Sequence, residues 1–179
     1  AKILAEVVYS AITGDYGGLR LPSVYSSGMV LQRGAPLQLN GTANAGERVK
    51  VTLQGQKINP KRGLTFLTTA KDDGSWGLSI PSPEAGGPDT LTFQAKSRII
   101  QLDSVYIGEV WLCSGQSNMA MQLRETKDQD LAQQANDPEL RIYDMKPAHV
   151  TDAVPWPVSF LDSLNRLDYY LPAQWQAAT

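Results

Sequence analysis

The sequence has little of two residue types on which many sites are built, with one cysteine and one histidine among its 179 residues. A single thiol, Cys113, excludes an intrachain disulfide and a zinc cluster made of cysteines. We expect Cys113 to be a buried structural thiol, because it ends a short apolar run. The single histidine, His149, stands in a Pro-Ala-His-Val-Thr stretch and is expected to be an ordinary loop residue.

Long apolar runs and clustered positive charge are also absent. No segment approaches the roughly 20 apolar residues that span a bilayer, and Lys2 and Glu6 interrupt the N-terminal stretch, so no membrane span or signal-peptide core is predicted. The net charge is −2, which argues against nucleic acid as a partner. No P-loop, dinucleotide fingerprint or metal motif occurs. The missing initiator methionine fits a cleaved secretory signal or a trimmed start, and we expect a secreted or periplasmic protein.

Residues 19–105 have the pattern of short strands. Apolar and polar residues alternate in several stretches, which predicts antiparallel strands with one face towards water. The alternating apolar positions are Leu37 and Leu39; Val49, Val51 and Leu53; Trp76, Leu78 and Ile80; and Leu91, Phe93 and Ala95. Turn-forming residues separate these stretches, and residues 71–76 are expected to form a hairpin tip. The pattern predicts an antiparallel β-sandwich domain over residues 1–105.

The pattern changes after residue 105. Residues 110–113 form a continuous apolar run, which predicts a strand buried on both faces. A helix-like pattern then starts at Met119 and ends near Asn136, and a second apolar strand is predicted around Leu140 and Ile142. A β-α-β order is the building unit of a parallel sheet. We therefore expect residues 106–179 to begin an α/β domain that this chain alone leaves incomplete.

Ser117 stands on the predicted turn between the strand and the helix. A serine there projects its hydroxyl from the end of the sheet, and the free N–H groups of the helix start can stabilise an oxyanion. The spacing fits a helix cap equally, which is the commoner role of serine at such a turn. The segment is not a G-x-S-x-G elbow, because Met119 stands two residues after Ser117. Nothing in the spacing places His149 opposite Ser117 as its base.

Residues 107–123 read IGEVWLCSGQSNMAMQL and resemble the first catalytic block of the sialate O-acetylesterase family, a branch of the SGNH (GDSL-type) hydrolases. The stretches LRLPSVYSSGMVLQRGAPLQLNGTANAGERVKVTL and DDGSWGLSIPSPEAGGPDTLTF resemble that family's N-terminal β-sandwich. The resemblance implies that Ser117 is the nucleophile and that its backbone N–H contributes to the oxyanion hole. It implies that Gln116 and Asn118 flank the site, either contacting substrate or holding the turn. The family's other oxyanion donors and its late Asp-x-x-His block have no counterpart here.

The function that the resemblance implies is that of a serine esterase. Such an enzyme removes O-acetyl groups from sugars such as 9-O-acetylated sialic acid through an acetyl-enzyme, without a metal or organic cofactor. The histidine and aspartate would come from a remainder of the enzyme, because the sequence is a fragment or because a second chain supplies them. We expect two chains. The alternatives are an acetylesterase for xylan or another plant glycan, and a non-catalytic carbohydrate-binding or scaffold module.

Overall fold

The computed structural model describes residues 2–55, 61–81, 83–113, 121, 125–127, 130, 136–143 and 175–178. Within these residues the main elements are one helix and nine strands. They are α1 (Lys2–Thr13), β1 (Val30–Gln32), β2 (Leu37–Thr42), β3 (Arg48–Gly55), β4 (Leu64–Thr69), β5 (Ser75–Ile80), β6 (Gly86–Gln94), β7 (Ile99–Gly108), β8 (Asp137–Ile142) and β9 (Gln176–Ala178).

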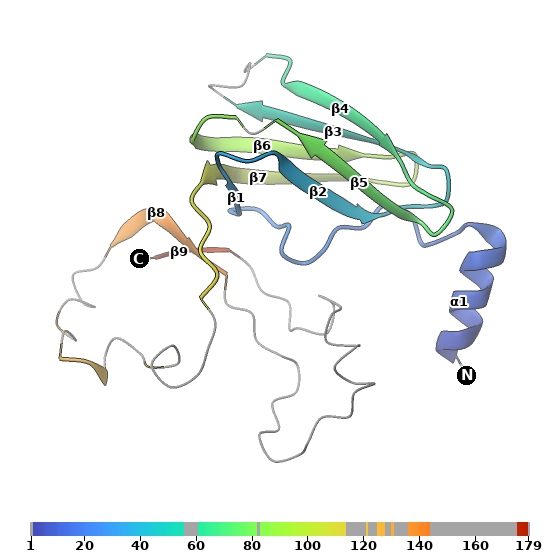
Figure 1. The fold of residues 1–179 in the computed structure, drawn as a ribbon, viewed down its shortest axis with the longest axis horizontal. Coiled ribbons are helices and arrows are strands. Elements are labelled where there is room, and N and C mark those ends of the chain that lie inside the picture. The colour runs from blue at the N-terminus through green and yellow to red at the C-terminus, as the bar shows by residue number, and fades with distance from the viewer. Residues whose placement is uncertain are drawn as a thin grey trace.

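Seven of these strands form two sheets that share one core. The larger sheet has five strands in the order β1-β7-β6-β3-β4, and the smaller one pairs β2 with β5 (Figure 1). All pairs are antiparallel except β1 and β7, which run parallel. The prediction of an antiparallel β-rich fold is confirmed, with the addition of this one parallel pair.

The core forms because apolar residues alternate along the strands. Val49, Val51 and Leu53 of β3 are buried, while Arg48 and Lys50 between and beside them face solvent. The two sheets meet where Trp76 of β5 contacts Phe93 of β6, with ring centroids 5.9 Å apart. Full burial of one such side chain contributes about 1.5–3 kcal/mol to folding.

The turn over residues 71–76 does not form the expected hairpin tip. It reverses the chain tightly, because Lys71 N–H donates to Ser75 O at 2.8 Å and Gly74 N–H donates to Lys71 O at 2.9 Å. However, it joins β4 of the larger sheet to β5 of the smaller one. Turn residues specify a reversal, but the partners that each strand finds in the core decide its sheet.

The predicted buried strand over residues 110–113 is wrong. The parallel pairing of β7 with β1 ends at Gly108, and residues 109–113 have no regular structure. Trp111 and Leu112 are 83% and 91% exposed, and Cys113 is exposed instead of buried. An apolar run becomes a buried strand only when neighbouring strands cover it, and within the described residues no strand pairs with 110–113.

The remaining elements were predicted in part. β8 occupies the position of the expected second strand, but it pairs antiparallel with β9 instead of in a parallel β-α-β unit. Helix α1 was not predicted. Residues 114–120, 131–135 and 144–174 lie outside the described residues, so the SGNH-type α/β domain over 106–179 stays a prediction. The boundary at residue 105 also stays a prediction, and β7 runs across it.

No helix within the described part of the chain has the length and apolar character that a bilayer span requires. The secreted or periplasmic location stays a prediction.

Candidate active site

The predicted site residues Gln116, Ser117 and Asn118 lie outside the described residues, as does His149. The structure describes the chain on both sides of them. Residues 109–113 precede Ser117, and residues 136–143 follow it. The contacts of these two segments establish where the serine-bearing part of the chain leaves the sandwich and where the chain returns to it.

Three side chains fasten the departing segment to β1. Arg33 Nε lies 2.6 Å from one carboxylate oxygen of Glu109, and Gln32 Nε2 donates to the other at 3.0 Å. The amide oxygen of Gln32 accepts a hydrogen bond from Val110 N–H at 2.9 Å. The backbone adds a bond from Arg33 N–H to Gly108 O at 2.8 Å. We call Gln32, Arg33 and Glu109 the exit clamp, because they hold the chain where it leaves β7.

The exit clamp is a polar contact at the surface. The side chains of Arg33 and Glu109 are 53% and 49% exposed, so solvent screens their ion pair and it contributes little to stability. Two hydrogen bonds hold the pKa of Glu109 below its ordinary value; the one from Gln32 has the larger effect and the one from Arg33 the smaller. The clamp therefore holds Glu109 and Val110 beside the end of β1.

The returning segment packs beside the same strand. Arg141 of β8 donates to the hydroxyl of Tyr106 in β7 at 3.0 Å, and its guanidinium lies 4.7 Å from the centroid of the Tyr106 ring. A cation over an aromatic face contributes about 0.5–2 kcal/mol, depending on solvent exposure. β8 is thus attached close to the point where β7 ends.

Trp175 and Tyr143 attach the β8–β9 ribbon to the loop that precedes β1. Trp175 Nε1–H donates to the carbonyl of Val24 at 2.9 Å, and the ring of Trp175 packs against the core. Tyr143 lies 5.4 Å from the Trp175 ring and hydrogen-bonds to Ser23 Oγ at 3.3 Å. In sequence, Ser117 therefore stands between the exit clamp and Arg141, and His149 stands between Tyr143 and Trp175.

Sequence reasoning missed these attachments. Arg33 and Glu109 are 76 positions apart, and no short motif joins two polar residues over such a distance. Within the described part of the chain, no group of three or more His, Cys, Asp or Glu residues could hold a metal ion. The fold and its contacts define a β-rich module from which a segment carrying a Gly-Gln-Ser-Asn block departs.

The chain is similar in sequence to proteins of known name. The chain is 36% identical over 110 residues to human sialate O-acetylesterase, and 36% identical over 113 residues to the enzyme of that name from Rattus norvegicus. Each match covers 58% of this chain and 20% of the relative. The chain thus spans about one fifth of the length of these relatives. No protein-family model matches it.

A solved structure agrees with the sequence matches. The chain is similar to a carbohydrate acetylesterase from Xanthomonas citri with a TM-score of 0.68 and 27% sequence identity. This similarity covers 90% of the chain and 33% of the solved one. The resemblance to sialate O-acetylesterases expected from the sequence is confirmed.

Proposed function

We propose that this chain is part of a serine esterase that removes O-acetyl groups from sugars, with Ser117 as the nucleophile. The observation that carries the proposal is the Gly-Gln-Ser-Asn block at residues 115–118 in a chain 36% identical over 110 residues to a sialate O-acetylesterase. The similarity to a solved carbohydrate acetylesterase supports the same class of substrate.

The chemistry follows the general scheme of serine esterases. Ser117 Oγ attacks the carbonyl carbon of the acetyl group while a base takes the hydroxyl proton. The Ser117 backbone N–H donates to the oxyanion that forms. The bond from the acetyl carbon to the sugar oxygen then breaks, and that oxygen receives the proton. Water attacks the acetyl-enzyme and releases acetate, which regenerates the serine. Gln116 and Asn118 contact the sugar or hold the turn.

The base comes from outside this chain in our proposal. His149 is the single histidine of the sequence, and the chain spans only about one fifth of its curated relatives. We propose that a second chain of the same enzyme supplies the histidine and the aspartate. Denaturing electrophoresis and native mass measurement test this point. A monodisperse, folded and active particle near 19.5 kDa would contradict it.

The exit clamp supports a positioned nucleophile. A catalytic side chain must be held within about 0.5 Å of its productive position, and segments anchored on a rigid sheet achieve this better than free loops. The hydrogen bonds of Gln32 and Arg33 to Glu109 anchor the chain upstream of Ser117 to β1.

Replacing Ser117 by alanine in the complete enzyme tests the nucleophile. Loss of an activated serine lowers kcat by roughly 10⁴-fold or more, so Ser117→Ala is expected to abolish turnover of an aryl acetate. Ser114→Ala is the matched control, because Ser114 precedes the same block and does not match the nucleophile position; it should retain activity. Retained turnover in Ser117→Ala, with no labelling of the wild type by a serine-directed phosphonate, would refute the assignment.

The sugar that carries the acetyl group needs its own test. The names of the relatives differ, since one specifies sialate and the other a carbohydrate in general. We propose 9-O-acetylated sialic acid as the first substrate to try, with acetylated xylan and other plant glycans as competitors. Release of acetate from a panel of these sugars, compared by kcat/KM, ranks them.

A further inference from the structure

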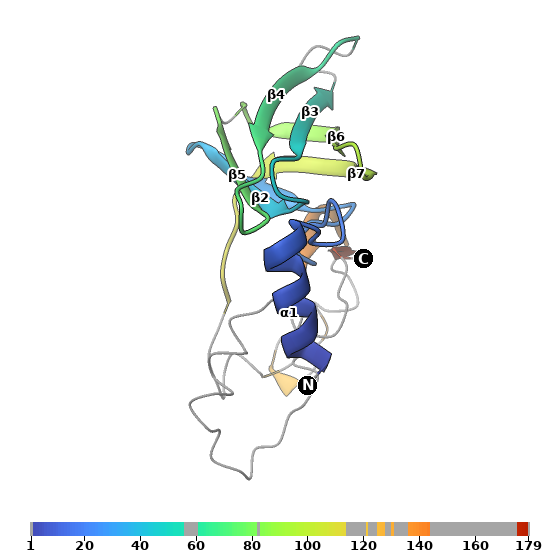
Figure 2. The same cartoon turned by 90° about the vertical axis from the view of Figure 1, so that its right-hand side faces the viewer.

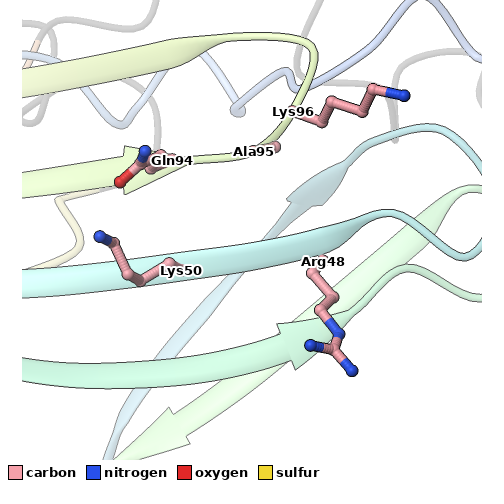
Figure 3. Close-up of a pocket in the computed structure, with 5 residues that line it drawn as sticks. All are labelled: Arg48, Lys50, Gln94, Ala95 and Lys96. Carbon is pink, nitrogen blue, oxygen red and sulfur yellow. The ribbon is translucent and has the colours of Figure 1, made fainter.

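The outer face of the larger sheet carries a basic depression at the start of β3 and the end of β6. It is lined by Arg48, Lys50, Gln94, Ala95 and Lys96 and has a volume of about 280 Å³ (Figure 3). Arg48 and Lys50 project from the same face of β3, because Val49 between them points into the core. Lys50 stands opposite Gln94 in the register of β3 with β6, and Lys96 follows that strand.

Two cations of the basic depression, Arg48 and Lys50, lack a nearby counter-charge. Within the described part of the chain, no carboxylate forms an ion pair with Arg48, Lys50 or Lys96. Lys96 differs from the other two, because Glu47 lies close enough for the two opposite charges to attract each other. Like charges side by side on a sheet are destabilising. An anion bound beside Arg48 and Lys50 would reduce that repulsion.

A row of hydroxyl and amide groups crosses the sheet next to the basic depression. The register places Thr52 between Thr65 and Thr92, and Thr92 opposite Gln101. These side chains alternate with the buried ones and so belong to the outer face. In the neighbouring row, Leu67 and Ile99 are exposed. Hydroxyl partners beside apolar patches match the surface of a sugar ring, which offers hydroxyl groups and C–H faces.

We propose that the basic depression binds the anionic group of an acidic glycan, either a carboxylate or a sulfate, while the sugar hydroxyls contact the threonine row. The net charge of the whole chain is −2, so the attraction for an anion is confined to this face. A small basic patch suits a single acidic sugar, whereas a long nucleic acid needs many positive contacts. The site is formed by β3 and β6 and does not depend on the role of Ser117.

Calorimetric titration of the 179-residue chain tests the proposal. The probes are an oligogalacturonide, a sulfated dextran oligosaccharide, an uncharged dextran oligosaccharide and a short DNA duplex. We expect binding of one or both acidic glycans, with no binding of uncharged dextran and weaker binding at higher salt. The preferred acidic probe identifies the anionic group. Binding of uncharged dextran with equal affinity, or of DNA alone, would overturn the proposal.

Charge-removing variants locate the site. The double variant Arg48→Gln with Lys50→Gln should weaken binding of the acidic glycan about tenfold, as expected for the loss of two exposed charge pairs. Lys61→Gln removes one positive charge at the opposite end of the β3–β4 hairpin and should leave the affinity unchanged. Circular dichroism checks that both variants remain folded. Wild-type affinity in the double variant, or an equal loss in Lys61→Gln, would overturn the proposal.

Discussion

Two apolar stretches, β3 before Gly108 and residues 110–113 after it, differ in burial. In the sandwich, Val49 and Val51 of β3 are completely buried. Just after Gly108, Trp111 and Leu112 are almost fully exposed, although the run that contains them is more continuously apolar than β3. Figure 2 shows the chain after β7, in yellow, leading away from the two sheets. The difference is coverage: Val49 and Val51 pack in the core shared with the smaller sheet, whereas residues 110–113 belong to no strand in the described part of the chain. An apolar run is buried only where a second layer covers it.

The largest expected effect tests this comparison with one truncation on each side of Gly108. Phe93 is fully buried and contacts Trp76 and Tyr25, so Phe93→Ala should lower the free energy of unfolding by about 3–5 kcal/mol. Leu112→Ala should change it by less than about 0.5 kcal/mol, because an exposed side chain leaves no cavity. Urea unfolding followed by tryptophan fluorescence measures both.

The two truncations should therefore differ by several kcal/mol. A destabilisation by Leu112→Ala comparable to that of Phe93→Ala would break the comparison, since it would mean that Leu112 is packed in solution.

Two tryptophans sharpen the comparison further. Trp175 donates its indole N–H to Val24 O and packs on the core, whereas Trp111 is exposed. Trp175→Phe keeps an aromatic ring and removes the donor, which should cost about 0.5–1.5 kcal/mol in the free energy of unfolding. Trp111→Phe is the matched control and should be neutral.

Equal stability of the two tryptophan variants would show that the β8–β9 ribbon does not stay attached to the sandwich in solution. Limited proteolysis provides a second measurement, because a detached ribbon would be cut faster in Trp175→Phe than in Trp111→Phe.

The strands of the sandwich could be predicted because their signal is local. Period-two alternation in β2, β3 and β6 identified the core positions Leu39, Val51 and Phe93, and all three are buried. The sheet to which each strand belongs could not be predicted. The turn over residues 71–76 looks like a hairpin tip, but β5 pairs with β2 because Leu39 and Trp76 both face the shared core.

The candidate site could be predicted only as a sequence motif. Residues 107–123 and their resemblance singled out Ser117, whereas the contacts that fasten the flanking segments are invisible in sequence. Tyr106 and Arg141 are 35 positions apart, and the exit clamp joins residues 76 or more positions apart. Such pairs form because folding brings β1, β7 and β8 together, and nothing in either local sequence specifies the partner.

The smallest expected effect concerns the exit clamp, where the two regions meet. Hydrogen bonds from Gln32 and Arg33 lower the pKa of Glu109, so Gln32→Ala should raise that pKa towards its ordinary value. Because the folded pKa lies below the unfolded one, the stabilisation from this carboxylate is present above the unfolded pKa and is lost as the pH falls through the folded pKa. The loss of stability is small, since Glu109 is half exposed.

A ¹³C NMR titration of the Glu109 carboxyl measures the change in its pKa. Gln38→Ala is the control, because Gln38 hydrogen-bonds to Ser79 within the smaller sheet and does not contact Glu109. An unchanged pKa in Gln32→Ala would mean that Gln32 does not hold Glu109 in solution, and the backbone bond from Arg33 N–H to Gly108 O would then be the main attachment at the end of β7.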